Sequence, residues 1–170
     1  QVQSKPPLPD LGQVQPVTMD CQSDLAARYF SEGAGLDEGD TDQQEQAIIA
    51  YRQALVLDPS LVPALVNLAN LHYARDELIE AQALYERAIH LEPDCFEAYF
   101  NLGNIQHDLG RFGDACDCYQ LALRLNPNYA DTHFYLAVTL EKLGRSEDAR
   151  PHWQTYQQLV PDGEWVALAK

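Results

Sequence analysis

Small and aromatic residues recur along this chain at a fixed spacing of 34 residues. In each repeat an alanine is followed four positions later by an aromatic residue: Ala47 and Tyr51, Ala81 and Tyr85, Ala115 and Tyr119, Ala149 and Trp153. The same spacing separates four prolines, Pro59, Pro93, Pro127 and Pro161. Agreement of several columns at one period indicates an array of repeated units rather than a chance pattern.

Helices are expected to alternate through each unit. Proline disfavours helical φ/ψ in the residue before it, so each proline ends the second helix of its unit. Gly110 and Gly144 stand where a first helix must turn into a second helix. The pattern predicts an all-α fold with helices over residues 20–34, 43–57, 61–75, 78–91, 95–109, 112–125, 129–143 and 146–159.

These columns resemble the tetratricopeptide repeat (TPR), and the resemblance covers about residues 19–170. It implies a right-handed α-solenoid of antiparallel helix pairs, a TPR superhelix in which each unit contacts mainly its neighbours. We assign residues 1–18 to a Pro/Gln-rich linker, residues 19–161 to four repeat units and residues 162–170 to a C-terminal capping helix. Because the chain starts at Gln1 rather than Met, we expect it to belong to a longer protein.

The first unit departs from the pattern through an acidic insert at residues 34–46. Its carboxylates lack the oxygen spacing and the glycine placement of a calcium-binding loop, so no metal site is expected. A solvated loop that the fold does not need is favoured, since charged runs usually face water.

Composition excludes several classes of function. The net charge of −15 creates a field that repels a phosphate backbone, and no Lys/Arg cluster interrupts it, so direct nucleic-acid binding is not expected. No apolar stretch is long enough to span a membrane and no signal peptide is recognisable, so the chain is expected to be cytoplasmic. The oligomeric state stays open.

Neither catalysis nor a cofactor finds support in the sequence. The five histidines are scattered over the units without a recurring partner, and no glycine-rich phosphate loop is present. Cys116 and Cys118 lie about 200° apart around a helix, so both sulfurs cannot easily bind one ion, and the four cysteines are expected to be reduced thiols. We therefore expect no enzyme activity, no catalytic residues, no metal and no cofactor.

The resemblance also implies a peptide-binding groove, because in the family the first helices of successive units line a concave face. The corresponding residues of this chain are Val66, Asn67, Asn70, Tyr73, Phe100, Asn101, Asn104, His107, Phe134 and Glu141. Val66, Phe100 and Phe134 could form an apolar stripe for anchoring side chains, or they could instead contact neighbouring first helices.

Asparagine pairs recur at Asn67 with Asn70 and at Asn101 with Asn104, three positions apart on one helical face. They look like the asparagine ladder of O-linked N-acetylglucosamine transferase, where amides can bind the backbone of an extended peptide. Bonds to neighbouring helices or water are the alternative, because buried amides must be satisfied. The ladder fails at Tyr135 and Val138, so it is limited to two units.

A carboxylate-binding clamp, as in chaperone-binding relatives, needs Lys and Arg where this chain has Val66, Phe100, Asp131 and Tyr135. A heat-shock chaperone tail is therefore a poor candidate ligand. Carboxylates are expected near the groove at Glu97, Asp108, Asp131 and Glu141. A neutral to basic protein or peptide segment is favoured as partner.

The leading hypothesis is a non-enzymatic protein-interaction scaffold. One alternative is a regulatory or oligomerisation module of a bacterial transcription regulator whose DNA-binding domain precedes Gln1, suggested by the linker and the missing Met. A second alternative is the substrate-recruiting arm of a transferase, suggested by the asparagine pairs alone.

Overall fold

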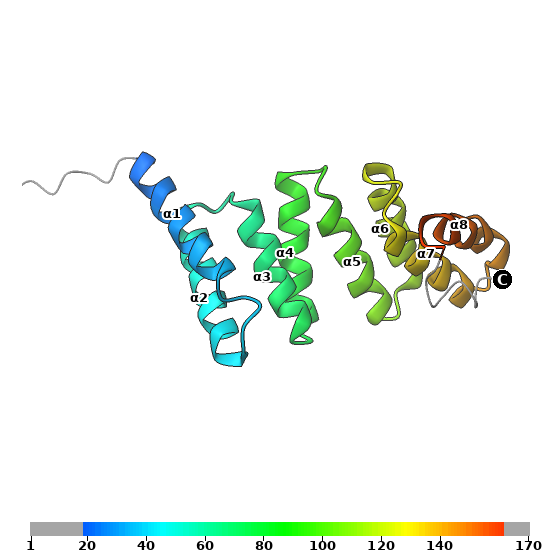
Figure 1. Ribbon diagram of the computed structural model, residues 1–170, viewed down its shortest axis with the longest axis horizontal. Coiled ribbons are helices and arrows are strands. Elements are labelled where there is room, and N and C mark those ends of the chain that lie inside the picture. The colour runs from blue at the N-terminus through cyan, green and yellow to red at the C-terminus, as the bar shows by residue number, and fades with distance from the viewer. Residues whose placement is uncertain (1–18, 162–170) are drawn as a thin grey trace, which may run out of the picture.

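The computed structural model describes residues 19–161, and α-helices are the only regular secondary structure among them. The helices are α1 Met19–Ala34, α2 Thr41–Leu57, α3 Val62–Ala74, α4 Leu78–Leu91, α5 Phe96–Asp108, α6 Phe112–Leu125, α7 Ala130–Lys142 and α8 Ser146–Leu159. They follow one another along a single long axis from α1 at one end to α8 at the other (Figure 1). The linker and the capping helix expected from the sequence lie outside the described residues.

Packing follows chain order. It is most extensive within the pairs α1/α2, α3/α4, α5/α6 and α7/α8, and each second helix also contacts the first helix of the next unit. The first helices α3, α5 and α7 touch one another in turn. Contacts between neighbours alone are the packing of an all-α solenoid, which confirms the predicted fold class. No helix of the described part combines the length and the apolar composition needed to cross a bilayer.

Local backbone chemistry sets where the second helices end. The residue before each proline leaves the helical region, as Asp58 does at φ −134° and ψ 90° and Glu92 does at φ −130° and ψ 92°. This is the conformation that a following proline imposes by steric exclusion. The predicted stop signals are thereby confirmed at both positions.

The turns after the first helices need a left-handed residue. Gly110 and Gly144 fill this position with φ of 74° and 72°, as their place in the sequence predicted. In the second unit the equivalent residue is Asp76, which adopts φ 60° despite its side chain. Glycine reaches this region without the steric cost that a Cβ brings.

The acidic insert is not the loop that the sequence analysis expected. Helix α2 begins at Thr41, so the second half of residues 34–46 is helical. The insert also supplies the cap of α2. The Asp40 side chain accepts a hydrogen bond from the backbone N–H of Gln43, and the Gln43 side chain accepts one from the backbone N–H of Asp40. In addition Asp37 accepts a 2.5 Å hydrogen bond from the hydroxyl of Tyr51. The expectation of a loop through residue 46 is therefore wrong, although most of the segment is exposed as expected. That the fold does not need the insert stays a prediction.

The alanine and tyrosine columns form the core. Ala47, Ala81, Ala115 and Ala149 are fully buried, as are Tyr51, Tyr85 and Tyr119. The tyrosine rings pack against small residues of the first helices: a Cβ added at Gly103 would lie 2.6 Å from Cε1 of Tyr119. Close approach of this kind explains why the column opposite each tyrosine holds glycine or alanine.

Candidate functional site

The hydroxyl group of each core tyrosine reaches an asparagine of a first helix. Tyr119 donates to Oδ1 of Asn104 over 2.6 Å, and Tyr85 donates to Oδ1 of Asn70. In the first unit Tyr51 accepts a 3.2 Å hydrogen bond from Nδ2 of Asn67. The asparagine pairs therefore serve the packing between helices.

Asn70 has the largest number of these contacts. Its Oδ1 also accepts from Nδ2 of Asn101 over 3.1 Å, and its own Nδ2 donates to Oε1 of Glu97 over 3.2 Å. Both acceptor sites of the Asn70 Oδ1 and one of the two Nδ2 hydrogens are thus used within the chain, which leaves a single N–H to offer a bound peptide. Of the two alternatives for the asparagine pairs, bonding to neighbouring helices is the one that the geometry supports.

The core tyrosines keep their protons. Burial raises the pKa of Tyr85 and of Tyr119 far above the ordinary value for a phenol. Burial, followed by the hydrogen bond to Asp37, raises the pKa of Tyr51 in the same way. Tyr85 and Tyr119 thus remain hydrogen-bond donors over the whole accessible pH range.

We call the surface formed by α3, α5 and α7 the first-helix face. The predicted groove residues lie on it with one exception, Val66. Its side chain is only 4% exposed and belongs to the buried cluster between the second and third units. Val66 is therefore wrong as a groove residue, because one residue corresponds to about 100° around a helix and carries the position next to Asn67 into the core.

Aromatic side chains in mutual contact form a strip that runs along the carboxyl-terminal half of this face and onto α8. The ring of Phe100 lies 5.3 Å from the ring of Tyr129 and 5.9 Å from that of Tyr135. Farther along, the ring of Phe134 lies 5.3 Å from Tyr135 and 5.5 Å from Trp153. We call these five residues the aromatic strip. Tyr135 is its most open member at 38% exposure.

Two hollows open on the first-helix face. The larger, of about 310 Å³, is lined by Asp37, Glu38, Gln44, Asn67, Asn70, Leu71 and Ala74. The smaller, of about 130 Å³, is lined by Tyr73, Asn104, His107, Asp108, Tyr119 and Tyr135, and we call it the tyrosine pocket. Neither lining contains Lys or Arg. Five of the ten predicted site residues thus lie in one hollow or the other.

Hydrogen bonds fix the histidine of the tyrosine pocket in one tautomer. The Thr139 hydroxyl donates to the carbonyl oxygen of Tyr135 over 2.6 Å, so it can only accept from Nδ1 of His107, which lies 2.9 Å away. Nδ1 therefore carries the proton and Nε2 is the acceptor. Burial, together with the charge of Lys142, lowers the pKa of His107 below the ordinary histidine value.

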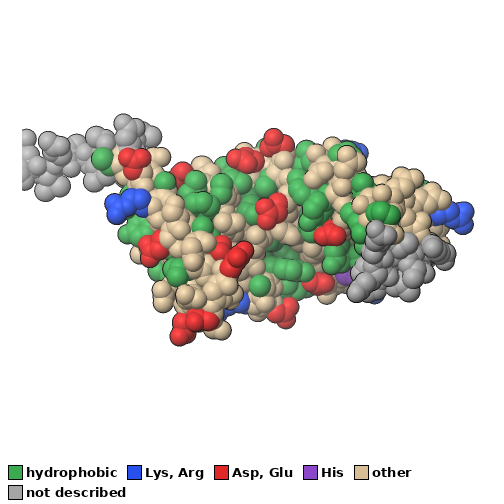
Figure 2. All heavy atoms as spheres, viewed as in Figure 1, with side chains coloured by type: hydrophobic (Ala, Val, Ile, Leu, Met, Phe, Trp, Pro, Cys, Tyr) green, Lys and Arg blue, Asp and Glu red, His purple; other side chains and the backbone are tan. Residues whose placement is uncertain are grey.

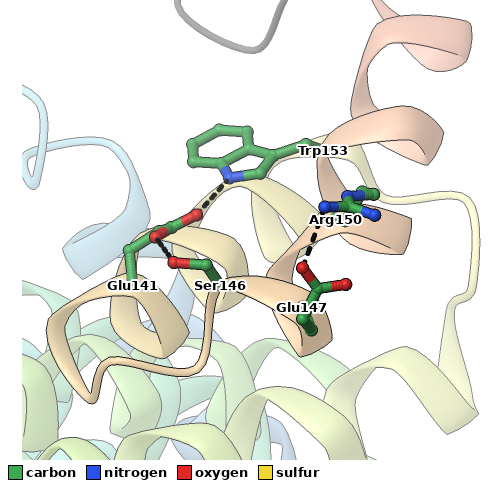
Figure 3. Close-up of polar contacts among 5 residues, drawn as sticks. All are labelled: Glu141, Ser146, Glu147, Arg150 and Trp153. Atoms are coloured by element: carbon green, nitrogen blue, oxygen red, sulfur yellow. Dashed lines mark hydrogen bonds and ion pairs between the residues drawn. The ribbon is translucent and has the colours of Figure 1, made fainter.

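Glu141 has a structural role at the end of α7. Its carboxylate accepts from the hydroxyl of Ser146 over 2.6 Å and from Nε1 of Trp153 over 3.4 Å, joining α7 to α8 (Figure 3). A separate ion pair of 2.9 Å joins Arg150 and Glu147 along α8 in the same view. Both oxygens of Glu141 are thus engaged within the chain, although the residue is exposed.

A third hollow, of about 240 Å³, lies among α2, α3 and α4 and is lined by Glu45, Ile48, Ile49, Arg52, His72, Arg75 and Glu77. Its charges pair with one another: Arg75 contacts Glu77 over 2.8 Å and Glu45 over 3.8 Å. None of the predicted groove residues lies there.

The thiols show no arrangement for metal binding. Cys116 is buried and Cys118 is half-buried, and burial raises the pKa of Cys118 to about 11, which favours the neutral thiol. In the part of the chain that the structure describes, no three His, Cys, Asp or Glu side chains gather closely enough to hold a metal ion.

Comparison with known families identifies the repeats. Two family models, both described as tetratricopeptide repeat, match residues 66–130 and residues 118–150, together half of the chain. The chain belongs to the tetratricopeptide repeat family. The resemblance inferred from the alanine, tyrosine and proline columns is confirmed. A search of the curated proteins found no match.

Solved TPR structures share the fold. A crystal structure of MamA is 20% identical, with a TM-score of 0.68 over 86% of this chain and 81% of that chain. A second structure, MamA AMB-1, is 25% identical with a TM-score of 0.65 over 93% of this chain and 84% of that chain. The first TPR of Spaghetti (RPAP3), bound to the HSP90 peptide SRMEEVD, is 20% identical with a TM-score of 0.68 over 72% and 95% of the two chains.

The sequence analysis missed the role of the tyrosine column as the partner of the asparagines. A signal was present, because each asparagine lies 15 residues before or 16 residues after a core tyrosine: Asn104 precedes Tyr119, and Asn67 follows Tyr51. Tyr135, 16 residues after Tyr119, occupies the same position and stacks on that ring with centroids 6.4 Å apart. Tyr135, which interrupts the asparagine ladder, is thus a member of the aromatic strip.

Proposed function

We propose that the chain is a non-enzymatic protein-interaction scaffold whose first-helix face binds a neutral to basic peptide segment. The observation that carries the proposal is the aromatic strip, which runs past the tyrosine pocket and includes the exposed ring of Tyr135. Rigid aromatic side chains supply contact area at low entropic cost and are enriched where proteins bind partners. Membership of the TPR family supports a scaffold role.

Charge favours a basic or neutral partner. Glu97, Asp108 and Asp131 are exposed on the elements that carry the aromatic strip. On the face drawn in Figure 2, Asp and Glu side chains are spread over the array while Lys and Arg side chains are few. A carboxylate-rich segment would meet repulsion along this surface without a compensating cation.

The HSP90 peptide bound to the Spaghetti TPR, SRMEEVD, holds two Glu and one Asp. Where a clamp for such a peptide needs cations, this chain has Phe100, Asp131 and Tyr135 on the face and Val66 in the core. We therefore propose a ligand of opposite character to that peptide. The asparagine pairs, which alone suggested the transferase arm, are engaged with tyrosines and no longer favour it.

Selection from a random 12-residue peptide library displayed on phage tests this function. We expect selected peptides enriched in Lys or Arg together with apolar residues, with affinity that falls as salt rises. Tyr135→Ala should weaken binding of a selected peptide roughly fivefold or more, since loss of a central aromatic contact commonly costs over about 1 kcal/mol.

Val56→Ala is the matched control, because Val56 is 81% exposed on α2, away from the first-helix face. Selection of acidic peptides, or equal loss of binding in the Val56 and Tyr135 variants, would contradict the proposal.

A further inference from the structure

The tyrosine pocket differs in composition from the other two hollows described above. It lies among α3, α5, α6 and α7, and its lining combines aromatic rings with one carboxylate, that of Asp108. Its volume of about 130 Å³ is several times the roughly 30 Å³ that one water molecule occupies in the liquid. The pocket therefore has room for the end of a side chain.

The carboxylate of Asp108 is only half engaged. Its Oδ2 accepts a 2.7 Å hydrogen bond from the hydroxyl of Tyr73, and no other described side chain bonds to it. That bond, after burial, raises the pKa of Tyr73, so the phenol stays a donor and holds the carboxylate in place. One oxygen of a positioned, ionised carboxylate is thus left for a ligand.

The other polar groups of the pocket are acceptors or are already engaged. Nε2 of His107 is an acceptor because Nδ1 carries the proton, and Oδ1 of Asn104 already accepts from Tyr119. Lys142, whose charge acts on His107, does not line the pocket, and its Nζ lies over the ring of Phe112 at 5.6 Å from the centroid. A carboxylate, an imidazole acceptor and aromatic faces together match a donor cation rather than an anion.

Hydrogen-bond geometry at Asp108 favours a lysine side chain over an arginine side chain as the ligand. A guanidinium binds a carboxylate best through two parallel hydrogen bonds, one to each oxygen. Because Tyr73 already takes one acceptor site of Oδ2, only Oδ1 of Asp108 keeps both of its acceptor sites, which suits the compact ammonium group of lysine better than a two-pronged guanidinium. The exposed ring of Tyr135 can cover the methylene stem of the same side chain.

We propose that the tyrosine pocket is a binding site for a lysine side chain of the partner segment, with the ammonium group on Asp108 and the stem against Tyr135. This rests on the proposed function, since the lysine reaches the pocket from a peptide on the first-helix face. It also deepens that function by assigning one residue type to one position of the ligand.

A titration followed by NMR amide shifts tests the site without a known partner. The probe is the tripeptide acetyl-Ala-Lys-Ala amide, compared with the same tripeptide carrying Nε-acetyl-lysine and with acetyl-Ala-Arg-Ala amide. We expect the lysine probe to shift the amides around Asn104, His107 and Asp108, and to bind roughly threefold to tenfold more tightly than either comparison probe.

Two variants locate the interaction. Asp108→Asn keeps the acceptor for Tyr73 but removes the charge, and should weaken the lysine probe roughly threefold to tenfold. Asp114→Asn removes the same charge from an exposed position on α6 outside the pocket and should leave the affinity unchanged.

Equal binding of the lysine and acetyl-lysine probes, tighter binding of arginine, or equal affinity in Asp108→Asn and wild type would overturn the assignment. These results are separable from failure of the proposed function. If the first-helix face binds selected peptides but does not bind the lysine probe, the scaffold proposal stands and only the lysine site in the tyrosine pocket is refuted.

Discussion

Removing the amide of Asn104 should destabilise the protein, although the sequence pattern placed this residue in a binding groove. The hydroxyl of Tyr119 donates to Asn104 over 2.6 Å, and Tyr119 itself is 0% exposed. Asn104→Ala leaves this donor without its partner, and an orphaned buried polar group costs about 1–3 kcal/mol. For a chain of this size the melting temperature falls by roughly 2–4 °C for each kcal/mol.

A double-mutant cycle isolates the hydrogen bond. Tyr119→Phe keeps the ring and leaves the half-buried Asn104 able to bond water, so it should cost only about 0.5–1.5 kcal/mol. Asn104→Ala/Tyr119→Phe has no orphaned hydroxyl and should be more stable than the sum of the single changes predicts, by about 1 kcal/mol. Urea unfolding followed by circular dichroism at 222 nm, the helix band, gives all four free energies.

The exposed Asn128, in the turn before α7, is the control, and Asn128→Ala should change the free energy of unfolding by less than about 0.5 kcal/mol. The reasoning fails if Asn104→Ala unfolds at the wild-type urea concentration, or if the cycle is additive. Either outcome would show that Asn104 does not depend on Tyr119 and can bind a peptide instead.

Two further predictions concern the turns and the last helix pair. Gly110→Ala should lower the free energy of unfolding by about 1–2 kcal/mol, because φ is 74° there and a Cβ would meet nothing within 4 Å, so the cost is conformational alone. Gly113→Ala, equally open but within α6, should instead raise it by up to about 1 kcal/mol, and urea unfolding showing the same sign for both would contradict this account. His152 lies with Nδ1 3.1 Å from Nδ1 of His133, and burial followed by the charge of His133 lowers its pKa. The unfolded chain then binds more protons, so stability is full above about pH 6.5 and falls as the pH drops below that value. His152→Gln should reduce the loss of stability between pH 7.5 and pH 5.5, whereas the exposed His90→Gln should not, and an unchanged pH slope in the His152 variant would count against the pairing.

The parts of the fold that followed from the sequence are those set by local chemistry. A proline excludes helical geometry from its predecessor whatever surrounds it, so the ends of α2 and α4 could be predicted from Pro59 and Pro93. The left-handed turn at Gly110 is equally local. The start of α2 was misplaced because the acidic run was interpreted by its charge, while the Asp40 and Gln43 capping pair, three residues apart, was overlooked.

The candidate site could not be predicted from the residues that share one face of a single helix. Asn67 and Asn70 share a face of α3, but that face meets Tyr51 of one unit and Tyr85 of another, and only the stacking of units decides which amides are engaged. Val66 was placed in the groove by the same one-helix reasoning, although its side chain is buried between units. The way in which successive repeats stack, rather than the pattern of residues within one repeat, determines which side chains remain available to a ligand.

Under the proposed function, we expect binding specificity to come from residues that break the repeat. The tyrosine and asparagine columns bond to each other, as Tyr85 does to Asn70 and Tyr119 does to Asn104. Tyr135 replaces the asparagine found at Asn67 and Asn101, and Asp108 stands where the neighbouring units have Ala74 and Lys142. These two departures line the same pocket. Under the proposed function, we expect a ligand that distinguishes this chain from proteins of the same fold to contact Tyr135 and Asp108, because the repeated positions are shared with the family and offer little to distinguish one array from another.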